Sequence, residues 1–252
     1  MKLIFILALL FYFPNAFSYE FTEDFKSGIY WPNYPIPMNL YVDNSSGLLS
    51  LSQIVAQAES EWEKSIGQEI WNINYMAVAN SGNLIRWSKN FSQETGFDSS
   101  TTLAVTIRTN DGSYFQRVEI ILNGQNQILI QNINSALKKT ILHELGHSIG
   151  LDHSDQDAIM QAYISYLDKL TSDDINGAIN ILDENTHRKD SGFRASLNGE
   201  KLKYEQNALA CGSINLNESG GSGPISFILG LVIFFLFFSF FNSFRYKFLI
   251  RT

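Results

Sequence analysis

Three of the four histidines in this chain of 252 residues lie within one short stretch, "TILHELGHSIGLDHS" (140–154). On a helix, residues four apart lie above one another, so His143 and His147 share a face and can reach one cation. Gly150 can adopt the left-handed conformation that ends a helix and turns the chain back, which brings His153 to the same point. The spacing therefore predicts a helix, a sharp turn and a metal site of three imidazoles.

An apolar stripe on the same helix sets its orientation. The stripe consists of Leu137, Ile141, Leu145 and Ile149. It should face the core, while the two imidazoles point nearly the opposite way and present ligands to a cleft. We expect the helix to begin at Asn134 or Ser135, because either is a suitable N-cap.

The number of ligands favours a catalytic site. Three protein ligands leave one position of a zinc ion open, whereas a structural zinc site is usually closed by a fourth. The remaining histidine, His187, and the only cysteine, Cys211, lie in a later polar segment. By chance, five fixed residues at these spacings occur in about one chain in ten thousand of this length. Histidines on a solvated helix are therefore a poor explanation of the pattern.

Together with "AIM" (158–160), the stretch "HELGHSIGLDHS" resembles the active-site sequence of the metzincin metallopeptidases, and more narrowly that of the matrixins. The resemblance implies one catalytic Zn²⁺ held by His143, His147 and His153. It also implies that Glu144 is the catalytic base.

Further positions follow from the same resemblance, which covers about 19–183. Met160 would be the methionine of the tight turn beneath the zinc site. Tyr163 could shape the pocket after the scissile bond or assist the oxyanion. The segment "LTSDDINGAINIL" (170–182) resembles the start of the last helix of the family. No histidine precedes His143, so the second, structural zinc site of matrixins is not expected, and calcium is left open.

The fold implied by the resemblance is α+β. It has a twisted mixed five-stranded sheet with an antiparallel edge strand, packed on an active-site helix and a second long helix, plus a C-terminal helix. Sequence periodicity agrees and indicates strands at 38–42, 70–78, 83–88, 101–109 and 117–123, with helices at 52–67 and 171–182. By position the edge strand is Thr101 to Thr109, and it must be exposed if an extended peptide is to pair with it. A plain core strand is the alternative.

Both ends of the chain are apolar, which predicts an exported protein. Residues 1–18 have the layout of a signal peptide cleaved before Tyr19, although an uncleaved anchor is the alternative. The run at 224–244 is long enough to cross a membrane, and the basic residues 245–252 would stay inside. The predicted order is signal peptide 1–18, peptidase domain 19–184, polar stalk 185–223, membrane or sorting helix 224–244 and basic end 245–252.

The C-terminal region resembles bacterial sorting tails of the Gly-Gly type, on the residues "CGSI" (211–214) and "ESGGSGP" (218–224). The resemblance implies a sorting protease as a partner. It places the protein in the cell envelope or on the surface, anchored or released after processing. Cys211 could then carry a lipid or another attachment. A permanent anchor with an incidental thiol is equally open, and a thiolate reaching back to the zinc is a third reading.

The net charge of −7 argues against nucleic acid as a partner. We expect a monomeric, membrane-tethered or surface-sorted endopeptidase that hydrolyses extended polypeptides with zinc-activated water. Two alternatives use the same fold. One is a catalytically idle surface binding or adhesion module, which would have no chemical need for Glu144. The other is a hydrolase of a non-peptide substrate.

Overall fold

The computed structural model describes residues 19–41, 51–77, 80–195 and 207–211, which all belong to one compact unit spanning residues 1–214. The predicted signal peptide 1–18 and the predicted membrane or sorting helix 224–244 lie outside the described residues. Within the described ranges, no helix combines the length and the apolar character needed to cross a bilayer.

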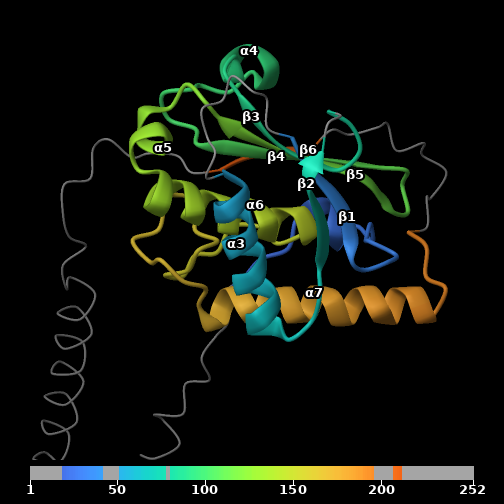
Figure 1. The fold of residues 1–252 in the computed structure, drawn as a ribbon. Helices are drawn as coiled ribbons and strands as arrows, with labels where there is room; N and C mark the ends of the chain where they lie inside the picture. Colours follow the sequence, from blue (N-terminus) through green and yellow to red (C-terminus); the bar gives the residue numbers. More distant parts are fainter. Residues whose placement is uncertain (1–18, 42–50, 78–79, 196–206, 212–252) are drawn as a thin grey trace, which may run out of the picture. The chain divides into compact units, whose positions relative to one another are not determined.

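A mixed sheet of six strands forms one layer of this unit (Figure 1). The strands are β1 Ile36–Tyr41, β2 Trp71–Ala77, β3 Leu84–Ser88, β4 Ala104–Asn110, β5 Phe115–Asn123 and β6 Asn207–Cys211. Their order is β2-β1-β3-β5-β4-β6. The first four strands in this order pair in parallel, and β4 is antiparallel to both of its neighbours. The α+β class, the five predicted strands and the antiparallel direction of β4 are confirmed.

Strand β6 is the main departure from the expected fold. Its residues pair with the outer side of β4, from Ala104 opposite Cys211 to Arg108 opposite Asn207. The expectation that β4 offers an exposed edge is therefore wrong in this structure. The sequence of β6, "NALAC", has no β-branched or aromatic residue, so its composition gives no strand signal. It forms a strand because β4 provides a ready ladder of backbone groups.

Three long helices lie on one side of the sheet (Figure 1), and shorter helical turns lie before β1, between β3 and β4, and between β5 and α6. The long helices are α3 Leu51–Ile66, α6 Lys138–Ile149 and α7 Ser172–Asp190. The shorter turns are α2 Glu23–Lys26, α4 Phe91–Thr95, α5 Gln127–Gln131 and the π-helical turn η1 Ile133–Leu137. Helix α6 contacts α3, α7 and strands β4 and β5, so it lies at the centre of the unit.

Helix α6 is enclosed on all sides. Every residue from Thr140 to Ile149 is buried, and so is Leu137, the remaining member of the predicted apolar stripe. The sequence predicted that one face of this helix would be buried and the other would point towards a cleft. In the structure, β4 and α3 also contact the helix. Indole groups satisfy outward carbonyls of the helix: Trp62 Nε1 donates to Leu142 O at 2.9 Å, and Trp31 Nε1 donates to Ser148 O at 2.9 Å.

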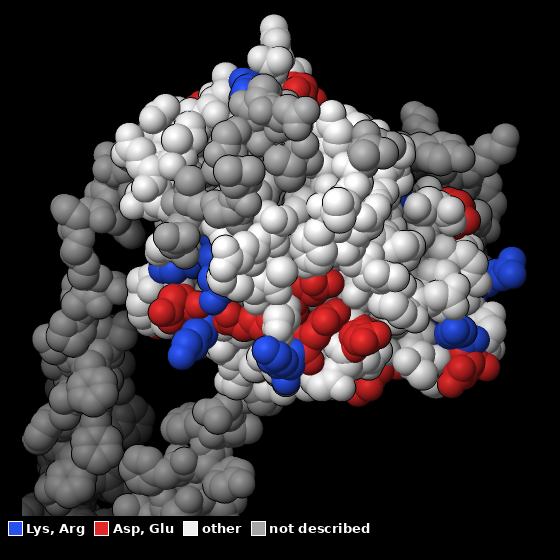
Figure 2. Space-filling model, viewed as in Figure 1, with Lys and Arg blue, Asp and Glu red and all other residues white. Residues whose placement is uncertain are grey.

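The start of this helix differs from the expectation of a side-chain cap. The chain enters through η1, and α6 proper begins at Lys138. Lys138 Nζ lies 2.6 Å from Glu61 Oε2 of α3, while Glu61 Oε1 accepts from Leu170 N at 3.2 Å. This carboxylate therefore joins α3, α6 and the segment before α7. In Figure 2, acidic and basic side chains gather side by side on the lower part of the viewed face, whereas its upper part is mostly uncharged.

Candidate metal centre

Helix α6 ends at Gly150 as the sequence predicted. Gly150 has φ 118°, a conformation that side-chain-bearing residues rarely adopt. Its amide and that of Leu151 donate to carbonyls of the last helical turn at 3.2 and 3.1 Å. A Cβ at Gly150 would lie 3.2 Å from Phe25 Cδ2, so there is little space for one. The reversal of the chain at this glycine brings His153 back beside the helix.

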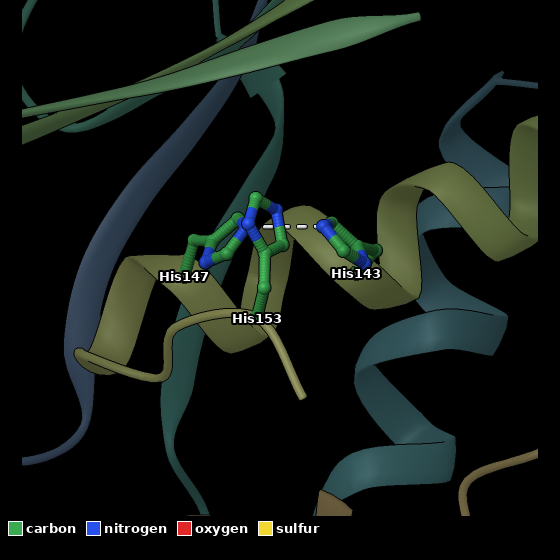
Figure 3. A group of neighbouring side chains, drawn as sticks. All are labelled: His143, His147 and His153. Atoms are coloured by element: carbon green, nitrogen blue, oxygen red, sulfur yellow. Dashed lines mark hydrogen bonds between the residues drawn. The ribbon is translucent and has the colours of Figure 1, made fainter. Parts of the chain in front are cut away.

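The three predicted ligands converge (Figure 3). One ring nitrogen from each of His143, His147 and His153 lies within 4.8 Å of the others. The ring centroids are 4.6, 5.3 and 5.0 Å apart. The first two rings come from α6 and the third from the loop that follows it. Among the described residues, these three form the one cluster of histidine, cysteine and acidic side chains with metal-ligand geometry.

Backbone carbonyls fix the orientation of the two helical rings. His143 Nδ1 lies 2.7 Å from Ile159 O, and His147 Nδ1 lies 2.7 Å from Leu151 O. A carbonyl oxygen can only accept, so both Nδ1 atoms carry the proton. The Nε2 atom of each neutral ring then has a lone pair, and these two atoms face each other at 3.0 Å. Such carbonyl partners are typical of the groups that orient metal-binding imidazoles.

The rings are electrically neutral. Burial lowers the pKa of His143 to about 3 and the pKa of His147 well below its usual value. Burial also lowers the pKa of His153, which is half-buried. Two neutral rings with lone pairs this close repel each other unless a cation lies between them. A tetrahedral zinc ion with Zn–N bonds of about 2.0 Å holds its nitrogens about 3.3 Å apart, so the residues fit zinc.

Glu144 is fully buried, and Thr106 of β4 contacts it directly. The Thr106 hydroxyl donates a short hydrogen bond to Glu144 Oε2. Sequence analysis missed this residue. The only sequence signal for Thr106 was the alternation of side chains along β4. This alternation places Thr106 on the face opposite Val105 and Ile107, towards α6.

Met160 packs against α6, and its assignment as the methionine beneath the zinc site stays a prediction. It is buried, and a Cβ built on Gly146 would be only 2.4 Å from the Met160 sulfur. The turn that carries it is held by Asp174, whose carboxylate accepts from Ile159 N at 3.1 Å and Met160 N at 3.0 Å. The same carboxylate forms the capping box at the start of α7 with Thr171. One acidic residue thus ties the methionine turn to α7.

A small pocket, with a cavity volume of about 20 Å³, opens beside Glu144. Its walls include Leu103, Thr140, His143, Ile159, Tyr163 and Ile164. Tyr163 is 54% exposed, so it lies at the rim. Its role in shaping the pocket or assisting the oxyanion stays a prediction.

A buried ion pair holds β4 to the end of α6, and the sequence gave no sign of it. Arg108 Nε lies 2.9 Å from Asp24 Oδ2, and both side chains are almost fully buried. Arg108 also donates from Nη1 to His147 O at 2.9 Å. The guanidinium therefore joins α2, β4 and the helical turn that carries a predicted ligand.

Two histidines on α6 and a third from the loop after it converge under a mixed sheet in which β4 runs antiparallel, and this cluster is like the zinc-binding motif of the metzincin class. The matrixin family profile matches residues 49–182, which is more than half of the chain. The chain therefore belongs to the matrixin family. Matrixins use zinc, and the three-histidine cluster fits a catalytic zinc site. The match gives calcium no support. No curated protein matches this sequence.

Proposed function

We propose that this matrixin is a zinc-dependent endopeptidase that cleaves extended polypeptides, with His143, His147 and His153 as zinc ligands and Glu144 as general base. The observation that carries the proposal is the pair of facing Nε2 atoms, 3.0 Å apart. Carbonyl acceptors hold the protons of both rings on the far nitrogens. A cation between the two Nε2 atoms would remove the repulsion of their lone pairs, and three neutral imidazoles are the ligand set of catalytic zinc.

A zinc ion in this site would lower the pKa of a bound water to about 7 and polarise the scissile carbonyl. Glu144 lies next to His143 in sequence and lines the same pocket. It would accept a proton from the attacking water and deliver it to the amine nitrogen of the leaving peptide. The water oxygen bonds to the carbonyl carbon and the C–N bond breaks. The Thr106 hydroxyl orients the Glu144 carboxylate for both transfers.

Substrate binding follows from the arrangement of β4 and the pocket. An extended peptide could pair with the outer side of β4 through backbone hydrogen bonds only where β6 has left that side. Leu103, just before β4, also lines the pocket beside Glu144. A side chain next to the scissile bond would enter this largely apolar pocket, with Tyr163 at its rim.

The test compares the purified full-length chain with Glu144→Gln. We expect one zinc per chain in both proteins. The parent should cleave casein in a chelator-sensitive way, and the variant should lose about 10²- to 10⁴-fold in kcat, as expected for a lost general base. Zinc is measured by elemental analysis and cleavage by a peptide-library digest. Normal turnover by Glu144→Gln would show that the assigned role is wrong.

The same measurements separate the two alternatives. A binding or adhesion module would hold zinc but cleave nothing in the parent form. A hydrolase of another substrate would leave peptides intact and turn over a non-peptide ester or amide in a zinc-dependent way. The first alternative gives Glu144 no function, although the residue is buried and hydrogen-bonded beside the metal site.

Export and membrane attachment or surface sorting complete the proposal. They rest on the sequence patterns of residues 1–18 and 211–252, almost all of which lie outside the described residues. N-terminal sequencing of the mature protein should show Tyr19 first. Its C-terminal peptide, identified by mass spectrometry, would show whether a sorting protease removes the apolar segment.

A further inference from the structure

The outer side of β4 is occupied by a segment of the same chain. Residues Asn207 to Cys211 form β6 and pair antiparallel with β4 over five residue pairs. The segment carries no charged residue. It lies close to α6 as well as to β4. An uncharged, extended peptide therefore already rests on the edge that a substrate would need.

The paired stretch coincides with the functional part of β4. Thr106, opposite Leu209, is the residue that binds Glu144. Ala104, opposite Cys211, directly follows Leu103, which lines the pocket beside Glu144. Strand β6 therefore runs along β4 from Arg108 past Thr106 to Ala104, and its last residue lies at the pocket end of β4. This is the path that an extended substrate would follow.

We propose that residues 207–211 are an intramolecular occupant of the outer side of β4 and compete there with substrate. The outward N–H and C=O groups of β4 can form a ladder with one strand at a time. Occupation by β6 and occupation by a substrate are therefore mutually exclusive. The inference rests on the proposed function, because it takes the substrate to bind along β4.

The energetics make β6 a displaceable occupant. Five residues without β-branched or aromatic side chains form a weak strand. Attachment to the same chain compensates, because a short tether gives an effective concentration in the millimolar range. A substrate that also fills the pocket makes additional contacts and displaces β6. Loss of β6 pairing should thus lower KM, while kcat, set by the metal site, stays unchanged.

The experiment uses the full-length zinc-loaded chain with the double substitution Ala208→Pro/Leu209→Pro. Backbone N–H groups of adjacent residues in a strand point in opposite directions, so one of the two prolines removes a bond to β4 whatever the register. Asn215→Pro/Leu216→Pro, outside β6, is the matched control. KM for a fluorogenic peptide should fall about tenfold in the first variant only, at constant kcat. An equal KM in all three proteins would overturn the proposal.

A binding measurement gives a second readout that does not depend on turnover. The probe is a fluorescein-labelled peptide of residues 205–213, with Cys211→Ser so that a thiol cannot bind the metal. All proteins carry Glu144→Gln so that the probe is not cleaved. Fluorescence anisotropy should show about tenfold tighter binding to Ala208→Pro/Leu209→Pro than to the two proteins with native β6. Equal affinities would contradict the competition.

The two readouts also separate failure of this inference from failure of the proposed function. If no zinc-loaded protein cleaves peptide, the peptidase proposal fails, and the anisotropy result still decides whether β6 occupies β4. If cleavage is normal and neither KM nor peptide affinity responds to the prolines, the competition is wrong and the peptidase proposal stands.

Discussion

At Glu144, a hydroxyl from a distant strand controls the position of the carboxylate. Thr106 lies 38 residues earlier in the sequence and donates to Glu144 Oε2 inside a fully buried site. A hydrogen bond to a charged group contributes about 1.5–3 kcal/mol. The bond therefore has enough strength to hold one rotamer of the carboxylate against its alternatives.

Replacing Thr106 with Val removes the hydroxyl and keeps the shape. We expect kcat to fall about tenfold, because the carboxylate is less well oriented towards the attacking water. Steady-state kinetics and zinc analysis check this result, with zinc content unchanged. Thr106→Ser keeps the hydroxyl and should retain most of the parent kcat. Equal kcat values for the Val and Ser variants would contradict an orienting role.

The buried histidines predict how stability depends on pH in the metal-free protein. The pKa of His143 is about 3 in the folded chain and about 6.5 when unfolded, because burial disfavours the charged ring. Between these values only the unfolded chain binds the proton, so the free energy of unfolding falls as the pH is lowered. The expected slope is about 1.4 kcal/mol per pH unit for one histidine.

Urea denaturation between pH 7 and 4 in the presence of a chelator measures this slope. His143→Gln has no proton to bind at this position, so its slope should be smaller by about 1.4 kcal/mol per pH unit. Comparing slopes cancels any constant loss of stability caused by the substitution. The same slope in both proteins would show that His143 is protonated to the same extent in the folded and unfolded chains.

At the scale of elements, one turn joins helix α6 to the third ligand. Gly150 ends the helix with positive φ and lies close to Phe25. The capping box of Thr171 and Asp174 starts α7 and holds the methionine turn. Both features were visible in the sequence, because glycine after a helix and acidic residues in a first turn are local signals.

Gly150→Ala should destabilise the protein by about 2–3 kcal/mol, because it combines an unfavourable φ with a close contact to Phe25. It should also weaken zinc binding, since His153 follows within the same turn. Gly192→Ala is a suitable control, because Gly192 has φ 67° and open space around it. The control should lose about 1 kcal/mol and keep its zinc affinity. Thermal unfolding and chelator competition measure the two effects.

At the scale of the whole molecule, a buried ion pair connects parts that are far apart in the sequence. Asp24 follows the first described residues, Arg108 lies in β4, and His147 O belongs to α6. Removing one partner of a buried pair leaves an uncompensated charge inside the protein. The pair therefore makes the N-terminal segment part of the metal-binding unit.

Asp24→Ala should reduce the free energy of unfolding by about 3–5 kcal/mol, as measured by urea denaturation. Glu23→Ala removes the exposed pairing of Glu23 with Lys26 and should change stability by less than about 1 kcal/mol. Similar losses in both variants would mean that Arg108 finds another partner or water when Asp24 is removed.

Features that depend on residues close together in the sequence were predicted, whereas features that depend on residues far apart in the sequence were not. Helix α6, its end at Gly150 and the start of α7 after Thr171 were predicted within a few residues. The predicted end of α7 at residue 182 is wrong, because the helix continues to Asp190, into the segment predicted as a polar stalk. The π-helical entry to α6 and the short helices α2, α4 and α5 were not, because they are brief and carry little periodicity. Strand β6 was missed because its partner strand, and not its composition, makes it a strand.

The sequence by itself determined the convergence of three imidazoles, because helical spacing and one glycine act within eleven consecutive residues. Only the tertiary structure decided which groups surround them: the carbonyls of Ile159 and Leu151 on the rings, Thr106 on Glu144, and β6 along β4. Local periodicity is fixed by neighbouring residues. Contacts between residues far apart in the chain depend on how the sheet and helices pack, and no short stretch of sequence contains that information.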